Sequence, residues 1–243
     1  MNRKWKRYVA SFIPRYISNR IVVRLYQVLS WIRVPRSVRE KNYVHNLKRL
    51  RGMDRGLWID PSVCIENQAQ WEDIRFGAGR HHSMCYSGCE IIAVFNARKR
   101  LYGSGTPEEL ADLIRRFEKK GAAFRGEFGT SPLTLMQYFR SCGMEVRTSY
   151  GKQRSVEDIE RESTVMIATV YNDGNDITRQ IHTVCITRNV SGGYILHNAY
   201  CKDKRGKYVE SVSYPTLREA ITHISGYGAK LIYLIGISRK KSS

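Results

Sequence analysis

The sequence has no apolar run long enough to cross a lipid bilayer. Its longest apolar stretch, residues 21–34, contains Arg24 and Gln27, whereas a membrane-spanning helix needs about 20 mostly apolar residues. A cleaved signal peptide is not expected either, because the apolar run after the first basic residues stops at Pro14 and Arg15 and no small-residue cleavage site follows. We therefore expect a cytoplasmic protein.

The sequence also lacks a paired-cysteine motif. Its six cysteines (64, 85, 89, 142, 185 and 201) are scattered, and none forms a CxxC pair. Neither a small disulfide scaffold nor a zinc finger is indicated, so we expect reduced thiols, no metal and no other cofactor. A zinc site of His81 or His82 with Cys85 and Cys89 is the alternative, although its spacing is not typical of such sites.

Acidic residues are scarce at the N-terminus. Residues 1–55 contain fifteen Lys and Arg against only Glu40 and Asp54, which places +13 of the formal charge of +19 there. Such a segment indicates an anionic partner, and an anionic membrane surface bound by an interfacial helix is one candidate. Nucleic acid is the minor alternative: the mixture of basic and aromatic residues could bind it, but no zinc finger or RNP-type box accompanies them. A basic helix docked on the protein body would explain the same pattern.

The rest of the chain changes from helical to strand-like periodicity. Helices are predicted at residues 89–103, 106–121, 132–143 and 155–162, with Thr106 and Glu109 forming a capping box. Strands are predicted at residues 164–171, 182–188, 194–199 and 230–237, with a hairpin turn at residues 189–193 and a last helix from Thr216. We expect an α+β fold in which helices pack on an antiparallel sheet. Residues 1–60 would form a basic helical extension, and residues 61–243 the main domain, with an irregular connector at residues 56–83.

Cys89 is the strongest candidate for a nucleophile. It follows Ser87 and Gly88 and opens an apolar helix, where unpaired N–H groups and the helix dipole favour a thiolate. His182 begins a strand, and Asn198 ends the next strand after the hairpin turn. Because a hairpin brings the start of its first strand beside the end of its second, we expect the Asn198 side chain to orient the His182 imidazole, which acts as the base.

Three segments resemble the cysteine, histidine and Asn/Asp boxes of papain-like cysteine peptidases: GCEIIAVFNA, HTVCITR and YILHNA. The nearest likeness is to the bacterial C39-like group, relatives of the domains that trim leader peptides from bacteriocins, and it covers roughly residues 83–240. The resemblance implies a papain-like fold, a triad of Cys89, His182 and Asn198, and cleavage of a peptide or protein substrate, such as a leader-bearing precursor, through a thioester. An acyltransferase and an inactive peptide-binding module on the same scaffold remain alternatives. The sequence indicates no oligomeric state.

Two features depart from that family. Glu90 follows the nucleophile, where glycine is common, and a carboxylate near the sulfur would oppose thiolate formation. The glutamine that usually completes the oxyanion hole is replaced by Ser83. We expect Ser83 or Ser87 to supply this donor. A glutamine of the connector, Gln68 or Gln70, is the alternative if the connector folds back.

The other cysteines and histidines are expected to be structural. Cys85 lies one turn before the helix and outside it, and Cys142 and Cys185 are expected to pack in the core or near the site. Cys185 is three positions from His182 on a strand, so the two side chains should face opposite sides of the sheet. His197 is likewise expected to point away from the triad.

Overall fold

The computed structural model describes Phe12, Pro14 and residues 16–150, 154–177, 180–199, 213–226 and 228–240. Its elements, in chain order, are α2 (Asn19–Leu29), α3 (Arg36–Arg51), α4 (Gly56–Ile59), η1 (Gln68–Gln70), α5 (Met84–Ser87), α6 (Cys89–Tyr102), α7 (Pro107–Lys119), η2 (Ala123–Gly126), α8 (Pro132–Ser141), β1 (Glu145–Thr148), α9 (Val156–Glu162), β2 (Val165–Tyr171), β3 (Ile181–Arg188), β4 (Tyr194–His197), β5 (Ser213–Tyr214), α10 (Leu217–Thr222) and β6 (Lys230–Ser238). Most helices precede the first strand, and this segregation confirms the expected α+β class.

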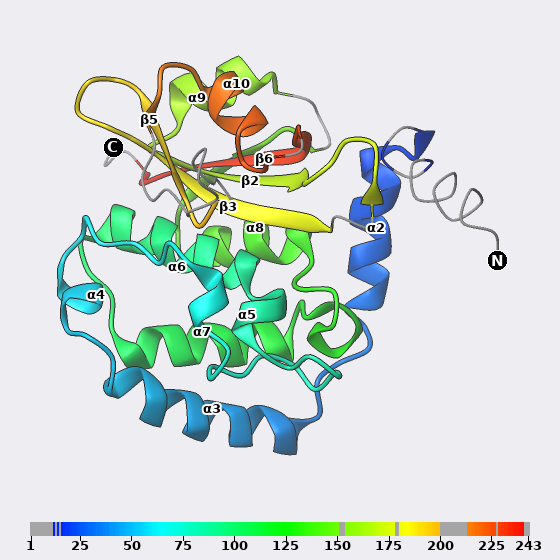
Figure 1. Ribbon diagram of the computed structural model, residues 1–243, viewed down its shortest axis with the longest axis vertical. Coiled ribbons are helices and arrows are strands. Elements are labelled where there is room, and N and C mark those ends of the chain that lie inside the picture. Colours follow the sequence, from blue (N-terminus) through cyan, green and yellow to red (C-terminus); the bar gives the residue numbers. More distant parts are fainter. Residues whose placement is uncertain are drawn as a thin grey trace.

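The strands form one antiparallel sheet with helices on both faces. Within the described residues its order is β1-β6-β2-β3-β4-β5, and every neighbouring pair is antiparallel. Helices α6 and α8 lie on one side of the sheet and α9 and α10 on the other (Figure 1). The four predicted strands are confirmed as β2, β3, β4 and β6, and the predicted turn joins β3 to β4 as a hairpin.

Burial of both faces explains the apolar sequence of the central strands. Every residue of β2 is buried. Val165 and Ile167 belong to the core shared with α6, whereas Met166 and Ala168 belong to the core beneath α9 and α10. The strand is therefore a continuous apolar run rather than an alternating one. The edge strands β1 and β5 were not predicted, because they are short and partly exposed.

Local signals place the starts and ends of the helices before the sheet. Thr106 Oγ1 accepts a hydrogen bond from the Glu109 N–H at 3.1 Å, and Glu109 Oε2 accepts one from the Thr106 N–H at 3.0 Å. The predicted capping box of α7 is therefore confirmed. Gly103 ends α6 in the left-handed conformation (φ 91°), and Pro132 opens α8. Helix α6 packs against β2 and β3 and thereby fixes the position of Cys89, its first residue.

The N-terminal helices α2 and α3 pack on the rest of the protein. Val22 of α2 and Leu50 of α3 belong to the same core as α6 and α8. Asn19 Nδ2 donates to two main-chain oxygens of β6, at 3.2 and 3.1 Å. The described part of residues 1–60 thus shares its core with the main domain, and a domain boundary at residue 60 stays a prediction. None of the described helices is long and apolar enough to cross a bilayer.

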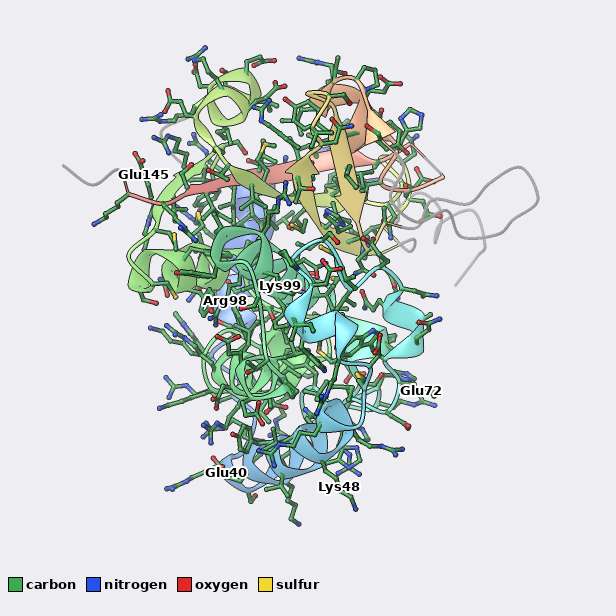
Figure 2. The ribbon with its side chains drawn as sticks, turned by 90° about the vertical axis from the view of Figure 1, so that its left-hand side faces the viewer. Glu40, Lys48, Glu72, Arg98, Lys99 and Glu145 are labelled. Atoms are coloured by element: carbon green, nitrogen blue, oxygen red, sulfur yellow. The ribbon has the colours of Figure 1, made fainter. Side chains whose placement is uncertain are left out.

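The connector, residues 56–83, is mostly irregular as expected and is held against α6 by two buried side chains. Asn96 Nδ2 donates to the Ile65 oxygen at 3.0 Å, and Asn96 Oδ1 accepts from the Ile65 N–H at 2.9 Å. Lys99, near the middle of the molecule in Figure 2, donates from Nζ to the main-chain oxygen of Val63 at 2.6 Å. These bonds satisfy the main chain of the connector and hold it beside the helix that carries Cys89.

Candidate active site

A cavity of about 240 Å³ lies at the start of α6. Its walls come from segments that are far apart in the sequence. They are Tyr26 of α2, Tyr86 and Ser87 of α5, Cys89 and Glu90 of α6, Glu127, Phe128 and Gly129 after η2, Ile177 and Gln180 between β2 and β3, and Ile181 at the start of β3. The candidate nucleophile from the sequence therefore faces a cavity rather than only the hydrophobic core.

The Cys89 thiol is buried and neutral at rest. Burial raises the pKa of this thiol well above its ordinary value, and the neighbouring Glu90 carboxylate raises it further. The thiol donates a hydrogen bond to Glu90 Oε2, 3.2 Å from the sulfur. A hydrogen bond from the Thr183 main-chain N–H to the sulfur acts in the opposite direction and lowers the pKa. Thr183 follows His182, so the sulfur reaches the strand that carries the candidate base. Side chains alternate along that strand, however, and Val170, the β2 partner of His182, belongs to the core beneath α9 and α10. The His182 ring therefore faces the other side of the sheet from α6, and His182 is not among the residues that line the cavity.

Glu90 faces the nucleophile, the orientation that opposes thiolate formation. Burial raises the pKa of Glu90 to about 7, although a hydrogen bond from the Thr130 main-chain N–H partly offsets this effect. The carboxylate occupies the space beside Gly129, where an added Cβ would lie 2.7 Å from Glu90 Oε2. Gly129 also has a φ of 73°, so a side chain there would be both strained and obstructed. Tyr26, a further wall of the cavity, has its pKa raised by burial and by Glu90.

The tautomer of His182 is fixed by one hydrogen bond. Its Nε2 lies 2.6 Å from the main-chain oxygen of Asn198. A carbonyl oxygen only accepts hydrogen bonds, so Nε2 carries the proton and Nδ1 carries the lone pair. Burial lowers the pKa of His182 to about 4, and the ring is therefore neutral at pH 7.

The side chain of Asn198 does not have the role predicted for it. The sequence predicts that its carboxamide orients the imidazole, whereas the main-chain oxygen makes that contact. The reason is the left-handed conformation of Asn198 (φ 64°), which Asn adopts more readily than most residues. The carboxamide pairs with Gln68 instead: its Oδ1 accepts from the Gln68 N–H at 3.0 Å and its Nδ2 donates to Gln68 Oε1 at 3.1 Å.

Both ends of the Gln68 amide are already hydrogen-bonded, so Gln68 is a poor candidate for the oxyanion donor. The connector folds back, which the sequence left open, but the Gln68 Nε2 donates to the main-chain oxygen of Cys85 at 2.9 Å. The amide of Gln68 thus joins the turn at Asn198 to the helix α5 that precedes the nucleophile. Sequence reasoning named Gln68 only as a substitute oxyanion donor and missed this role.

The two serine candidates for the oxyanion hole differ in their surroundings. Ser83 Oγ accepts from the Tyr86 N–H at 3.4 Å and caps α5. Ser87 is 5% exposed and lines the cavity with Cys89, and its Oγ has no hydrogen-bond partner among the described residues. The first N–H groups of a helix have no intrahelical acceptor, so the Cys89 N–H is a second donor at the same place. Ser87 is thus the better candidate.

The zinc alternative of the sequence analysis is not assembled in the structure. Cys85 lies outside α6, as expected, within the short helix α5, and it lines a different cavity together with His81 and His82. Cys89 lines the first cavity instead. The five cysteines within the described ranges are free thiols, as expected, and Cys201 lies outside those ranges.

His197 belongs to a polar cluster that the sequence did not indicate. Its Nδ1 lies 2.6 Å from Glu66 Oε1 and its Nε2 lies 2.8 Å from Thr187 Oγ1. Burial lowers the pKa of His197, but hydrogen bonds to Cys64 and Glu66 outweigh burial and raise it to about 9. The other oxygen of Glu66 accepts from the Asn198 N–H at 3.0 Å, so this cluster holds the turn that orients His182.

Comparisons with known proteins supply no assignment for this site. No family model, no curated protein and no solved structure matches the chain. The function of the site is therefore inferred from its own residues, and the likeness to papain-like peptidases rests on the three sequence segments that carry it.

Proposed function

We propose that the protein is a papain-like cysteine hydrolase in which Cys89 attacks the carbonyl carbon of a peptide. One observation carries the proposal. Cys89 opens helix α6 at a cavity that it shares with the buried hydroxyl of Ser87. His182, whose ring is held by the main-chain oxygen of Asn198, is the proposed base and must reach the sulfur by a movement of its side chain or strand. A nucleophile, a base and a group that orients the base are the parts of a thiol-hydrolase site.

The proposed reaction proceeds through a thioester. The Cys89 sulfur bonds to the carbonyl carbon while its proton passes to His182 Nδ1, and the carbonyl oxygen becomes an oxyanion. The C–N bond then breaks, and the imidazolium returns the proton to the leaving amine. A water molecule next attacks the thioester and gives a proton to the same nitrogen, which returns it to the departing sulfur. The acid product leaves and both residues are restored.

The resting protonation states make proton transfer part of the attack. The Cys89 pKa is raised by burial and by Glu90, and the His182 pKa is lowered by burial to about 4, so a thiol and a neutral imidazole coexist at pH 7. General-base catalysis by His182 is then required for attack. The Ser87 hydroxyl and the Cys89 N–H are the proposed donors to the oxyanion.

The size of the cavity suits one residue of an extended substrate rather than a whole small ligand. Its volume of about 240 Å³ is below the range of about 300–1,000 Å³ usual for sites that enclose a whole small ligand. Tyr26, Tyr86 and Phe128 give it aromatic walls. A single residue of an extended peptide is therefore the proposed occupant, and a leader-bearing precursor is the proposed kind of substrate.

An activated ester tests the proposal without knowledge of the substrate. Mixing the full-length chain with p-nitrophenyl acetate is expected to release one equivalent of p-nitrophenol in a burst, with the acetyl group found on Cys89 by mass spectrometry. Cys89→Ala is expected to show no burst, because the nucleophile is absent. Cys85→Ser, which removes the neighbouring thiol of α5, is expected to retain it.

Three results distinguish the alternatives. Acetylation of Cys85 or Cys142 in place of Cys89 would contradict the assignment of the nucleophile. Absence of any burst in the folded protein would favour an inactive peptide-binding module. A burst followed by transfer of the acetyl group to an added amine, rather than to water, would identify an acyltransferase on the same scaffold.

Helix α2 supports a second proposal, attachment to an anionic membrane surface. Its outer side exposes apolar side chains one turn apart: Ile21 and Leu25 are 57% and 55% exposed, and Trp31 just beyond the helix is 70% exposed. Arg20 and Arg24 directly precede Ile21 and Leu25 in the chain and are also exposed. An apolar stripe flanked by basic residues is typical of helices that lie in the headgroup region of a bilayer.

Vesicle co-sedimentation tests the attachment. We expect binding to vesicles that contain phosphatidylserine and not to vesicles of phosphatidylcholine alone, with the bound fraction falling as salt is raised. Trp31→Glu is expected to abolish most of the binding, whereas Val44→Glu, at a similarly exposed position on α3 (68%), is expected to have little effect. Equal binding to both vesicle types, or salt-sensitive binding to RNA instead, would contradict the proposal.

A further inference from the structure

A second group of reactive side chains lies beside the turn at Asn198. The Cys64 sulfur, a Glu66 carboxylate oxygen and a His197 ring nitrogen all lie within 4.8 Å of one another. Among the residues that the structure describes, no other group of three such side chains meets this condition. Glu66 holds the turn at Asn198, but this hydrogen bond does not explain why a thiol and an imidazole converge on the same carboxylate.

The imidazole of His197 is already oriented as a metal ligand would be. Its Nε2 is 2.8 Å from the Thr187 hydroxyl, which can accept the Nε2 proton. Nδ1 lies 2.6 Å from the Glu66 carboxylate and donates a proton to it, because a carboxylate only accepts hydrogen bonds. A metal ion bound at Nδ1 would displace this proton. Metal-binding histidines almost always donate their second nitrogen to such a partner, which fixes the ring and its tautomer.

Burial and charge also suit a divalent cation. His197 is 6% exposed and Thr187 4% exposed, so water compensates little for charge in this group. A thiolate from Cys64 and the carboxylate of Glu66 together balance the two positive charges of a metal ion, while the imidazole becomes neutral when the ion replaces its Nδ1 proton. Cys64 is only half-buried, so an ion can reach the group from solvent.

We propose that Cys64, Glu66 and His197 bind one zinc ion. Sulfur, imidazole and carboxylate ligands suit zinc, whereas calcium and magnesium prefer oxygen ligands alone. A tetrahedral ion needs a fourth ligand, for which a water or the Cys185 thiolate is available. Cys185 pairs with His197 in the β3–β4 ladder, so both side chains are on the same side of the sheet.

The ion would join two segments that are otherwise distant in the chain. Cys64 and Glu66 lie in the connector and His197 ends β4, and Glu66 also accepts from the Asn198 N–H at 3.0 Å. Zinc would therefore stabilise the contact between the connector and the end of β4. The site is inferred independently of the proposed hydrolysis, since it would exist in an inactive protein as well.

Cobalt is the probe for this site, because a cobalt–thiolate bond gives a charge-transfer band in the near ultraviolet. The full-length chain is freed of metal with a chelator, kept reduced with a phosphine, and titrated with Co²⁺. We expect one equivalent to bind with such a band, zinc to displace it, and zinc to raise the melting temperature. Cys64→Ser is expected to lose the band, and Cys142→Ser, on a thiol outside the group, to keep it.

A milder variant keeps the test decisive if Cys64→Ser does not fold. Thr187→Val removes only the hydrogen bond to His197 Nε2 and is expected to weaken zinc binding by about 10- to 100-fold. The absence of cobalt binding, or a band unchanged in both Cys64→Ser and Thr187→Val, would overturn the proposal. A band lost in Cys85→Ser would overturn it too, because the ion would then lie beside His81 and His82.

Discussion

Replacing His182 by alanine is expected to slow the acetylation of Cys89 by p-nitrophenyl acetate by about 100- to 10,000-fold at pH 7, the usual contribution of a general base. The reason is the raised pKa of the buried thiol, which leaves almost no thiolate when the base is absent. Stopped-flow measurement of p-nitrophenol release gives the rate, and circular dichroism checks that the variant is folded.

The pH profile separates loss of a base from a structural defect. Because the pKa of His182 is lowered to about 4, the ring is unprotonated above that pH, and the rate in the parent protein should fall as the pH drops through about 4. This inflection should be missing in His182→Ala. The exposed His223, at the end of α10, provides the matched control, and His223→Ala should leave both rate and profile unchanged.

A substitution at Glu90 should change the rate in the opposite direction. Glu90→Gln removes the carboxylate that accepts the thiol proton at 3.2 Å. The thiol pKa should fall, and each unit of that fall increases the thiolate fraction about tenfold. If Glu90→Gln slowed acetylation as strongly as His182→Ala, Glu90 rather than His182 would be the base.

Replacing Ser87 by alanine is expected to reduce the acetylation rate by about 100- to 1,000-fold, the effect of losing one oxyanion donor. The hydroxyl of Ser87 is buried at the cavity, without a partner in the described part of the chain, so its removal leaves no other group unsatisfied. The variant should therefore fold normally. Because iodoacetamide reacts with a thiol without forming an oxyanion, the alkylation rate of Cys89 should be unchanged.

Ser83 supplies the matched control for this prediction. Its Oγ caps α5, so Ser83→Ala is expected to cost about 1 kcal/mol of stability but little acetylation rate. The two serines were equal candidates in the sequence, and only the structure separates them. A larger rate loss in Ser83→Ala than in Ser87→Ala would reverse the assignment.

Local chemistry made much of the fold predictable. The capping box at Thr106 and Glu109 and the proline that opens α8 act within one turn of helix, so neighbouring residues contain the whole signal. The hairpin between β3 and β4 was predictable for the same reason, and it brings His182 to Asn198. The edge strands β1 and β5 carry no such signal, since pairing with β6 and β4 defines them.

The contacts inside the site depend on tertiary packing and were not predictable. The order of Cys89, His182 and Asn198 was visible in the sequence. The left-handed conformation of Asn198, which turns its main-chain oxygen towards His182 and its carboxamide towards Gln68, was not. Gln68 meets Asn198 only because the connector folds back across the start of α6. No local pattern near Glu66 indicates that it contacts His197.

The pairing of Gln68 with Asn198 joins positions 130 residues apart in the chain. Contacts of such large separation form late, because closing a long loop costs entropy before any contact compensates for it. Under the proposed mechanism, Cys89 of a newly synthesised chain would be exposed before its base could reach it. The chain would therefore have no hydrolytic activity towards other proteins until the two ends of the domain had come together.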